Sequence, residues 1–128
     1  YEWKTEGKRK TPYFIHLPGE ESFAFAGLWD RWEGTEVDAF SSYAVITKEA
    51  HESIGFIHHR MPVILPERHW GTWLDASASI EKVSTVLKDT LRGFENRTVS
   101  DLVNGVRNEG PELVKTLKRE SQKSFDFL

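Results

Sequence analysis

The chain has 128 residues, of which 38% are apolar and five are tryptophan, so it is large enough for one domain with a substantial core. It contains no cysteine, which excludes disulfides, thiolate zinc sites and a cysteine nucleophile within this chain. Its formal net charge of -3 gives no general attraction to nucleic acid. DNA binding therefore needs a local cationic patch, for which the candidates are Lys4, Lys8, Arg9 and Lys10.

The hydropathy pattern has no membrane signal. No apolar run approaches the roughly 20 residues that cross a bilayer, and the chain does not open with a charged and then apolar leader. We therefore expect a soluble intracellular protein, cytoplasmic and close to the nucleoid if the source is bacterial, with no membrane partner.

The first part of the chain is predicted to consist of strands. Residues 1–4 and 11–17 have strand patterns, and the polar segment between them contains Gly7, which suits a hairpin turn with a basic tip. Residues 22–28 alternate aromatic and small side chains and predict a third strand that pairs with the second. The segment from Trp29 to Trp32 has an acid and a base between two tryptophans, which indicates a packed corner with an internal salt bridge.

The central part combines further strands with the most informative polar cluster. Residues 40–47 are rich in β-branched and aromatic side chains and predict a fourth strand, followed by a helical turn over residues 48–53. Residues 62–65 form a short apolar strand, directly preceded by His58-His59-Arg60-Met61. Because a strand of buried side chains is stiff, polar residues at its start are held in fixed directions, as catalysis requires.

The remaining sequence is mainly helical in pattern. One helix is predicted from Pro66 to about Leu74, and a clearer one begins after Ser79, carries a single apolar stripe and stops at Gly93. Strands followed by helices favour an α+β domain, with a curled, mostly antiparallel, barrel-like sheet and flanking helices.

The C-terminal part is less regular. Residues 98–100 predict a brief strand, and Ser100 caps a short helix through Val106. The state of the segment from Pro111 stays open, and residues 121–128 are typical of a mobile tail.

The first strand begins at residue 1 and needs a neighbour, because the exposed edge of a sheet is normally covered. We therefore expect upstream sequence to belong to the same fold, and residues 1–128 to be the C-terminal portion of a single domain.

Glu2 and Trp3 point to opposite faces of this strand. If the side of Trp3 is the core, Glu2 faces water; if Glu2 lines a cleft, its carboxylate can transfer protons. Trp3 either stacks on an unpaired base, a contact worth about 1 to 3 kcal/mol, or packs in the core.

The histidines fit acid–base chemistry better than metal binding. His58 and His59 are adjacent, and on an extended segment they project oppositely, so they do not readily bind one ion together. With no cysteine and no histidine pair at i, i+4 beside a carboxylate, the sequence predicts no metal and no cofactor. An imidazole titrates near neutral pH, so one histidine can serve as acid and base, although a structural role is the alternative.

Arg60 and Thr47 are candidate phosphate contacts. The guanidinium of Arg60 can hold a phosphate or carboxylate through its planar fork, and a surface ion pair is the alternative. The hydroxyl of Thr47 can donate to a phosphate, and a strand-end cap is the alternative.

Several short motifs resemble, in order, those of the SOS response-associated peptidase (SRAP) family, also called abasic site processing proteins. They span residues 1 to about 110 and comprise Tyr1-Glu2-Trp3-Lys4, Pro12-Tyr13-Phe14, Ala26-Gly27-Leu28-Trp29, Thr47, His58-x-Arg60-Met61-Pro62, Trp73-Leu74 and Val99-Ser100-x-x-Val103-Asn104.

The resemblance implies a protein that binds single-stranded DNA at abasic sites, forms a covalent link with the open-chain sugar aldehyde and has autoproteolytic peptidase activity. In this family the amine and thiol of an N-terminal cysteine, exposed by removal of the initiator methionine, close a thiazolidine ring. At the matching positions, Glu2 and His58 are expected to be catalytic and to transfer protons. Trp3 is expected to pack against a base or sugar, while Thr47 and Arg60 contact phosphate.

The absence of cysteine departs from this family pattern, and the family's upstream half has no counterpart here. We expect this chain to be inactive alone and the complete protein to act in the DNA damage or SOS response, with the missing N-terminal portion as partner. Two alternatives stay open: a non-catalytic module that binds single-stranded DNA, and a structural or protein-interaction domain.

Overall fold

The computed structural model describes residues 1–34 and 38–117. The chain forms two compact units, one made of residues 1–15 with the described residues from Asn96 onward, the other of His16–Glu95. The tail predicted at residues 121–128 lies outside the described residues. In the described ranges, none of the helices has the length and apolar character of a membrane span.

The first unit is built on the predicted hairpin. Strand β1 (Glu2–Glu6) pairs antiparallel with β2 (Arg9–His16), and β9 (Glu95–Thr98) pairs with the other side of β2. Gly7 has a φ of 61°, which side-chain-bearing residues rarely adopt and which fits the first central position of a two-residue hairpin turn. The hairpin prediction is confirmed, and both strands extend closer to the turn than predicted.

Short segments after β9 complete this unit. The backbone N–H of Val99 donates to the carbonyl oxygen of Pro12 at 3.1 Å, and both side chains are fully buried. The Ser100 hydroxyl accepts from the backbone of Leu102, as an N-cap does, and starts the 3-10 helix η3 (Asp101–Asn104). A second 3-10 helix, η4 (Pro111–Val114), occupies the segment that the sequence left open.

The second unit contains three two-stranded antiparallel ribbons. They are β3 (Ala24–Phe25) with β8 (Ile64–Leu65), β4 (Gly27–Trp32) with β5 (Phe40–Val45), and β6 (Thr47–Glu49) with β7 (Arg60–Pro62). The third predicted strand, residues 22–28, is therefore divided between β3 and β4, and the prediction that it pairs with the second strand is wrong.

The ribbons meet at Ala26, Ile46 and Val63. Backbone N–H groups donate from Ala26 to Val63 (2.8 Å), from Ile46 to Ala26 (2.9 Å) and from Val63 to Ile46 (2.8 Å). Ala26 is completely buried, and its small side chain permits this close approach. The surrounding core comprises Ala26, Val63, Leu65 and Val86, with Ile46, Trp73 and Leu87 packed against it.

The helices of this unit are short. They are η1 (Pro18–Glu20), α1 (Glu52–Gly55), η2 (Glu67–His69), α2 (Trp70–Leu74) and α3 (Ile80–Lys88). Helix α3 begins directly after Ser79 as predicted, and the structure shows that the Ser79 hydroxyl caps it, accepting from the backbone of Lys82. The helix ends at Lys88 rather than at Gly93, because the chain becomes extended and the Leu91 N–H donates to the Ile64 carbonyl at 2.9 Å.

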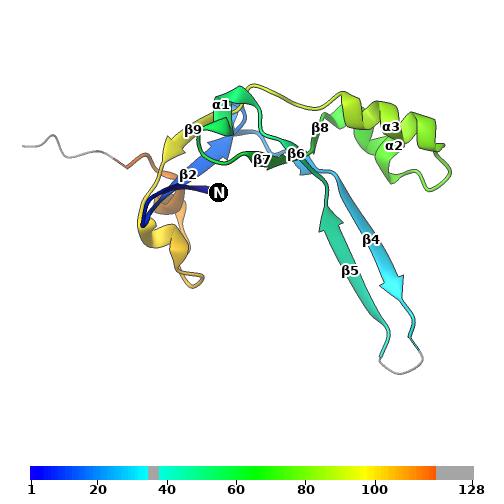
Figure 1. Ribbon diagram of the computed structural model, residues 1–128, viewed down its shortest axis with the longest axis horizontal. Coiled ribbons are helices and arrows are strands. Elements are labelled where there is room, and N and C mark those ends of the chain that lie inside the picture. The colour runs from blue at the N-terminus through cyan, green and yellow to red at the C-terminus, as the bar shows by residue number, and fades with distance from the viewer. Residues whose placement is uncertain (35–37, 118–128) are drawn as a thin grey trace, which may run out of the picture. The chain divides into compact units, whose positions relative to one another are not determined.

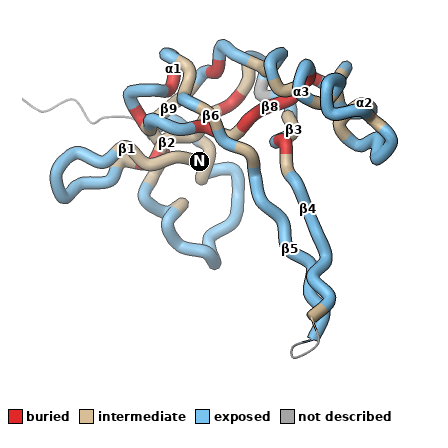
Figure 2. The backbone as a smooth tube through the Cα atoms, turned by 45° about the vertical axis from the view of Figure 1, so that its right-hand side comes forward, coloured by how far each residue is buried: buried red, intermediate tan, exposed pale blue. Residues whose placement is uncertain are grey.

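The ribbon β4–β5 extends away from β6, β7 and β8 (Figure 1). Apart from Gly27 at its start it is exposed along its length, whereas β8 is buried (Figure 2). Trp29 is 76% exposed and Trp32 46%, and Arg31 pairs with Glu33 rather than with Asp30. The predicted packed corner at Trp29 to Trp32 is therefore wrong, because these residues lie on a two-stranded ribbon with no covering layer among the described residues.

The α+β class with antiparallel sheets is confirmed. The described strands form four separate sheets and no closed barrel.

Candidate functional site

Thr47 and Arg60 are brought together by the register of β6–β7. Thr47 lies opposite Pro62, so Arg60 is its diagonal neighbour on the same face of the ribbon. The Nη2 of Arg60 donates to Thr47 Oγ1 at 2.8 Å. Both side chains are exposed, and the remaining donors of the guanidinium have no partner among the described residues. The pair thus presents a fixed, solvent-facing cation.

The stiffness of this ribbon comes from its other face. Met61, between Arg60 and Pro62, is only 2% exposed, and residues 63–65 further along the chain are buried as well. Because neighbouring residues of a strand point to opposite faces, burial of Met61 holds Arg60 outward. This confirms the expected buried strand beside the polar cluster.

His58 is anchored to the backbone of Arg60. Its Nδ1 lies 2.9 Å from the Arg60 carbonyl oxygen and 3.2 Å from the Arg60 nitrogen. An unprotonated Nδ1 accepts from the N–H, whereas a protonated Nδ1 donates to the carbonyl. The ring therefore has a partner in either protonation state, and Nε2 has no partner among the described residues. This geometry suits a group that gives and takes protons without turning.

His58 and His59 do not project oppositely. Their rings lie with centroids 4.6 Å apart and planes tilted by 32°. The prediction assumed an extended segment, but these residues occupy a bend between α1 and β7, so the alternation of a strand does not apply.

Glu2 lies in the first unit, on β1, directly opposite Tyr13 of β2. It is partly buried, and its Oε1 accepts from the backbone N–H of Trp3 at 3.1 Å. The aromatic side of this sheet is packed: Tyr1 contacts Phe14 at a centroid distance of 5.4 Å, and the Arg97 guanidinium lies 5.0 Å from the centre of the Phe14 ring. The Glu2 carboxylate consequently lies on the opposite face of the sheet.

Trp3 shares the packed side and is partly buried. Its indole Nε1 donates to Oδ1 of Asn104, at the end of η3, at 2.8 Å. This hydrogen bond fixes the edge of the indole ring, as expected if Trp3 packs within the fold. Because Trp3 is only partly buried, part of the ring stays accessible to solvent. The sequence placed Asn104 only in a family motif and not beside Trp3, because the two residues are 101 positions apart.

Lys48 is a neighbouring cation that does not join the Arg60–Thr47 pair. It is adjacent to Thr47 and therefore points to the other face of β6. Its ammonium donates to Thr90 Oγ1. Partial burial, followed by the positive charge of Arg92, lowers the pKa of Lys48 below its ordinary value.

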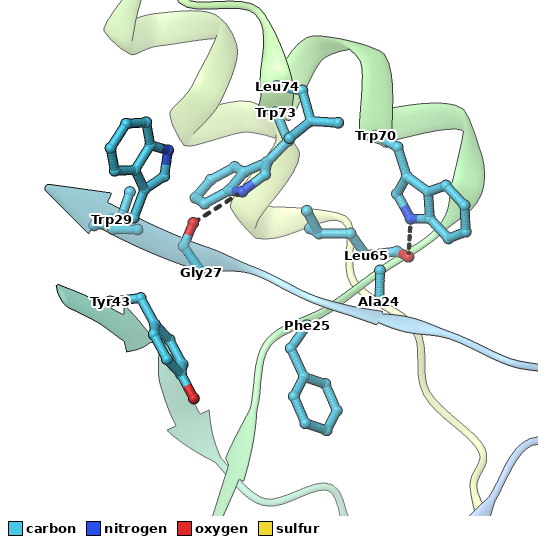
Figure 3. A pocket seen from close by; sticks show the side chains of 10 residues that line it. Ala24, Phe25, Gly27, Trp29, Tyr43, Leu65, Trp70, Trp73 and Leu74 are labelled. Carbon is cyan, nitrogen blue, oxygen red and sulfur yellow. Dashed lines mark hydrogen bonds between the residues drawn. The ribbon is translucent and has the colours of Figure 1, made fainter. Parts of the chain in front are cut away.

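An apolar cavity of about 390 Å³ lies in the second unit and holds none of the predicted site residues. Its lining includes Phe25, Trp29, Tyr43, Leu65, Trp70 and Trp73 (Figure 3). Two indoles are fixed by hydrogen bonds, from Trp70 Nε1 to the Leu65 carbonyl (3.0 Å) and from Trp73 Nε1 to the Gly27 carbonyl (3.2 Å). With no charged residue in its lining, the cavity is suited to packing rather than to proton transfer.

His69 belongs to a carboxylate cluster that the sequence did not indicate. Asp89 Oδ2 accepts from His69 Nε2 and from Arg68 Nη2, each at 2.7 Å. These hydrogen bonds, that of His69 first, lower the pKa of Asp89 below its ordinary value of 3.8. The cluster connects η2 with Asp89, the residue that follows α3.

No group of three or more His, Asp or Glu side chains in the described part of the chain is arranged to hold a metal ion.

Comparison with known proteins identifies relatives along most of the chain. Residues 1–106 match the family model described as SOS response associated peptidase (SRAP). The chain is 34% identical over 122 residues to abasic site processing protein YoqW of Bacillus subtilis, covering 91% of this chain and 53% of that protein. It is 33% identical over 132 residues to abasic site processing protein HMCES of Gallus gallus, covering 88% and 39%. The chain thus spans about half the length of these curated relatives, or less.

Two solved structures have a similar fold. A protein from Bacteroides thetaiotaomicron gives a TM-score of 0.74 at 28% identity, over 91% of this chain and 52% of that one. A phage-related protein from Bordetella bronchiseptica gives 0.60 at 30% identity, over 77% and 48%. Since the family model covers most of its residues, the chain belongs to the SOS response-associated peptidase (SRAP) family.

Proposed function

We propose that the protein, in its full natural length, processes abasic sites by binding single-stranded DNA and joining itself covalently to the sugar aldehyde. Family membership and the names of its relatives, which are called abasic site processing proteins, support this function. The proposal includes autoproteolytic peptidase activity and a role inside the cell in the DNA damage response. The observation that carries it is the Arg60–Thr47 pair, with His58 anchored on the backbone of Arg60.

This arrangement joins an anion-binding group and a proton-transfer group on one short stretch of chain. The free donors of Arg60 and the hydroxyl of Thr47 suit a phosphate, because guanidinium binds phosphate oxygens in a planar fork. His58 Nε2 suits proton exchange with an abasic sugar attached to that phosphate. Trp3 contributes the accessible part of its ring to a base or sugar.

The chemistry needs proton transfers but no oxidant or reductant. His58 moves a proton between the sugar hydroxyl and the ring oxygen as the hemiacetal opens to the aldehyde. The amine of an N-terminal cysteine adds to the aldehyde carbon, and loss of one water gives an imine. The thiol sulfur adds to the imine carbon, its proton passes to the imine nitrogen as the C=N π bond opens, and the thiazolidine ring closes. Glu2 accepts the proton from the amine and returns it to the departing hydroxyl.

The nucleophilic cysteine must come from sequence outside this chain, which contains none. Two features support a further segment of the same protein in the fold. Within the described residues, β1 is an edge strand with an unpaired side. The ribbon β4–β5 also exposes large apolar side chains on both faces, which isolated two-stranded ribbons do not tolerate well in water.

The test measures covalent capture of a single-stranded oligonucleotide that contains one abasic site, using denaturing electrophoresis of the full-length protein. We expect Glu2→Gln and His58→Ala each to slow product formation by about 10²- to 10⁴-fold, the usual contribution of a general acid or base. Glu6→Gln, on the same face of β1, and His59→Ala, beside His58, are the matched controls and should react at nearly the wild-type rate.

Three results would overturn the proposal. Unchanged rates in both Glu2→Gln and His58→Ala would remove the assigned chemistry. Binding that weakens with salt and never gives a denaturation-resistant product would indicate a non-catalytic single-strand binding module. Absence of any DNA affinity would indicate a structural or protein-interaction domain.

A further inference from the structure

The tip of the first hairpin is a cationic projection, which we call the basic arm and define as residues 5–10. All six residues are exposed. The arm carries Lys8, Arg9 and Lys10 against one acidic residue, Glu6, in a chain whose net charge is -3. Positive charge is therefore concentrated in the basic arm, although the chain as a whole is negative.

The one carboxylate of the basic arm is already paired. Glu6 Oε1 lies 2.8 Å from Lys4 Nζ, and this hydrogen bond, together with the charge of Lys4, holds the pKa of Glu6 below its ordinary value. Lys8 and Lys10 have no hydrogen bond or ion pair with any described residue. Their charges are consequently available to an external anion.

The register distributes these cations around the arm. Arg9 lies opposite Glu6 on one face, Lys10 lies opposite Thr5 on the other, and Lys8 occupies the turn beside Gly7. A ribbon with cations on both faces and at its tip has no fixed hydrogen-bonding pattern for reading base edges. It is suited to the regularly repeated charges of a phosphate backbone, which supply affinity without sequence preference.

The basic arm continues the strand that positions Glu2. From Glu2 to Gly7 the chain advances five residues, or roughly 17 Å at the rise of a β-strand. Phosphates follow one another every 3.4 Å or so along one strand of a duplex, so this length corresponds to at most about five phosphates. When the abasic sugar of a DNA strand lies at Glu2, the nucleotides that flank it can thus reach the basic arm.

We propose that the basic arm is a second DNA contact, which binds the phosphate backbone flanking the lesion through Lys8, Arg9 and Lys10. The inference rests on the proposed function, because it takes the lesion to lie at Glu2. It assigns the arm a role in affinity and none in the covalent step.

The experiment compares the double variant Lys8→Gln/Lys10→Gln with the control Lys82→Gln/Lys88→Gln on α3, which removes the same charge from exposed helix positions. Each full-length protein binds two oligonucleotides with one abasic site, with flanks of about ten and about two nucleotides, at several salt concentrations. Thermal unfolding checks that all variants are folded, and covalent capture is measured at saturating DNA.

On the long oligonucleotide, the arm variant should bind more weakly than the control. The slope of log K against log salt concentration should also become shallower by about 1.4, which is about 0.7 for each of the two lost phosphate contacts. On the short one it should match the control, and saturated capture should stay at the wild-type rate. Equal salt slopes for the arm variant and the control on the long oligonucleotide would overturn the arm contact. If covalent capture by the wild-type protein is still observed in that case, the proposed function stands. A wild-type protein that binds neither oligonucleotide would overturn both.

Discussion

The ribbons β6–β7 and β4–β5 lie in the same unit, are both two-stranded and antiparallel, and differ in what lies beneath them. In β6–β7 the central Met61 is 2% exposed, and the chain continues directly into the buried β8. In the longer β4–β5, Trp29 is 76% exposed and Tyr43 82%. Apolar composition therefore produced strands in both places, but only contact with the core produced a rigid surface.

This difference matters for where a site can be held. Arg60 and Thr47 have a fixed geometry because the opposite face of their ribbon is anchored. The aromatic residues of β4–β5 are largely exposed, although Trp29 and Tyr43 border the apolar cavity beside Trp73. The ribbon β6–β7 is accordingly suited to binding a ligand, whereas the ribbon β4–β5 is suited to being covered by another segment of polypeptide.

The largest expected effect comes from shortening leucines in the two regions. Leu65→Ala should lower the free energy of unfolding by about 2 to 5 kcal/mol, because it leaves a cavity in the core. Leu28→Ala, at a position 59% exposed in β4, should change it by less than about 0.5 kcal/mol in this chain. Urea unfolding measures both. Equal losses would contradict the comparison, because they would mean that Leu28 is buried in solution.

A smaller effect is expected from the aromatic pair on the exposed ribbon. Trp29 and Tyr43 lie directly opposite each other, and such cross-strand pairs contribute about 0.2 to 1 kcal/mol. A double-mutant cycle of Trp29→Ala and Tyr43→Ala should show coupling in this range. The cycle of Trp29→Ala with Phe40→Ala, which is not opposite Trp29, is the control and should show little. A coupling of zero for the opposite pair would indicate that the ribbon does not form in this chain.

The smallest effect concerns the Asp89 cluster beside the core. The pKa of Asp89 is lowered in the folded protein, so around its ordinary value of 3.8 the unfolded chain binds more protons than the folded one. Its stabilisation is complete above that pH and is lost as the pH falls through the lower, folded pKa. Wild-type Tm should therefore fall more steeply below about pH 4 than that of Asp89→Asn. Asp38→Asn, in an exposed loop, should retain the wild-type profile, and identical profiles for all three proteins would contradict the assignment.

Elements set by neighbours in sequence could be predicted. The hairpin β1–β2 follows from Gly7 between two strand patterns, and the start of α3 follows from the capping hydroxyl of Ser79. The pairing of residues 22–28 could not be predicted in the same way. Strand partners are chosen by which buried faces meet, and Ala26 meets Val63, which is 37 positions further along the chain.

In the candidate site, too, the residue types could be predicted from the sequence, but the contacts between distant residues could not. The motifs around Glu2, His58 and Arg60 were visible as residue types in a family order, and the roles assigned to them stay predictions. The bond from Arg60 to Thr47 and that from Trp3 to Asn104 needed the folded chain, because each joins residues far apart in sequence.

By itself, the sequence determined the antiparallel α+β class, the first hairpin, the starts of α3 and η3, and the chemical types available for a site, since each depends on short-range backbone preferences and side-chain chemistry. Only the tertiary structure decided which strands pair, which aromatic residues stay exposed, and how His58 and Arg60 are oriented. These depend on long-range burial, in which the same apolar side chain stabilises the fold or faces solvent according to what packs against it.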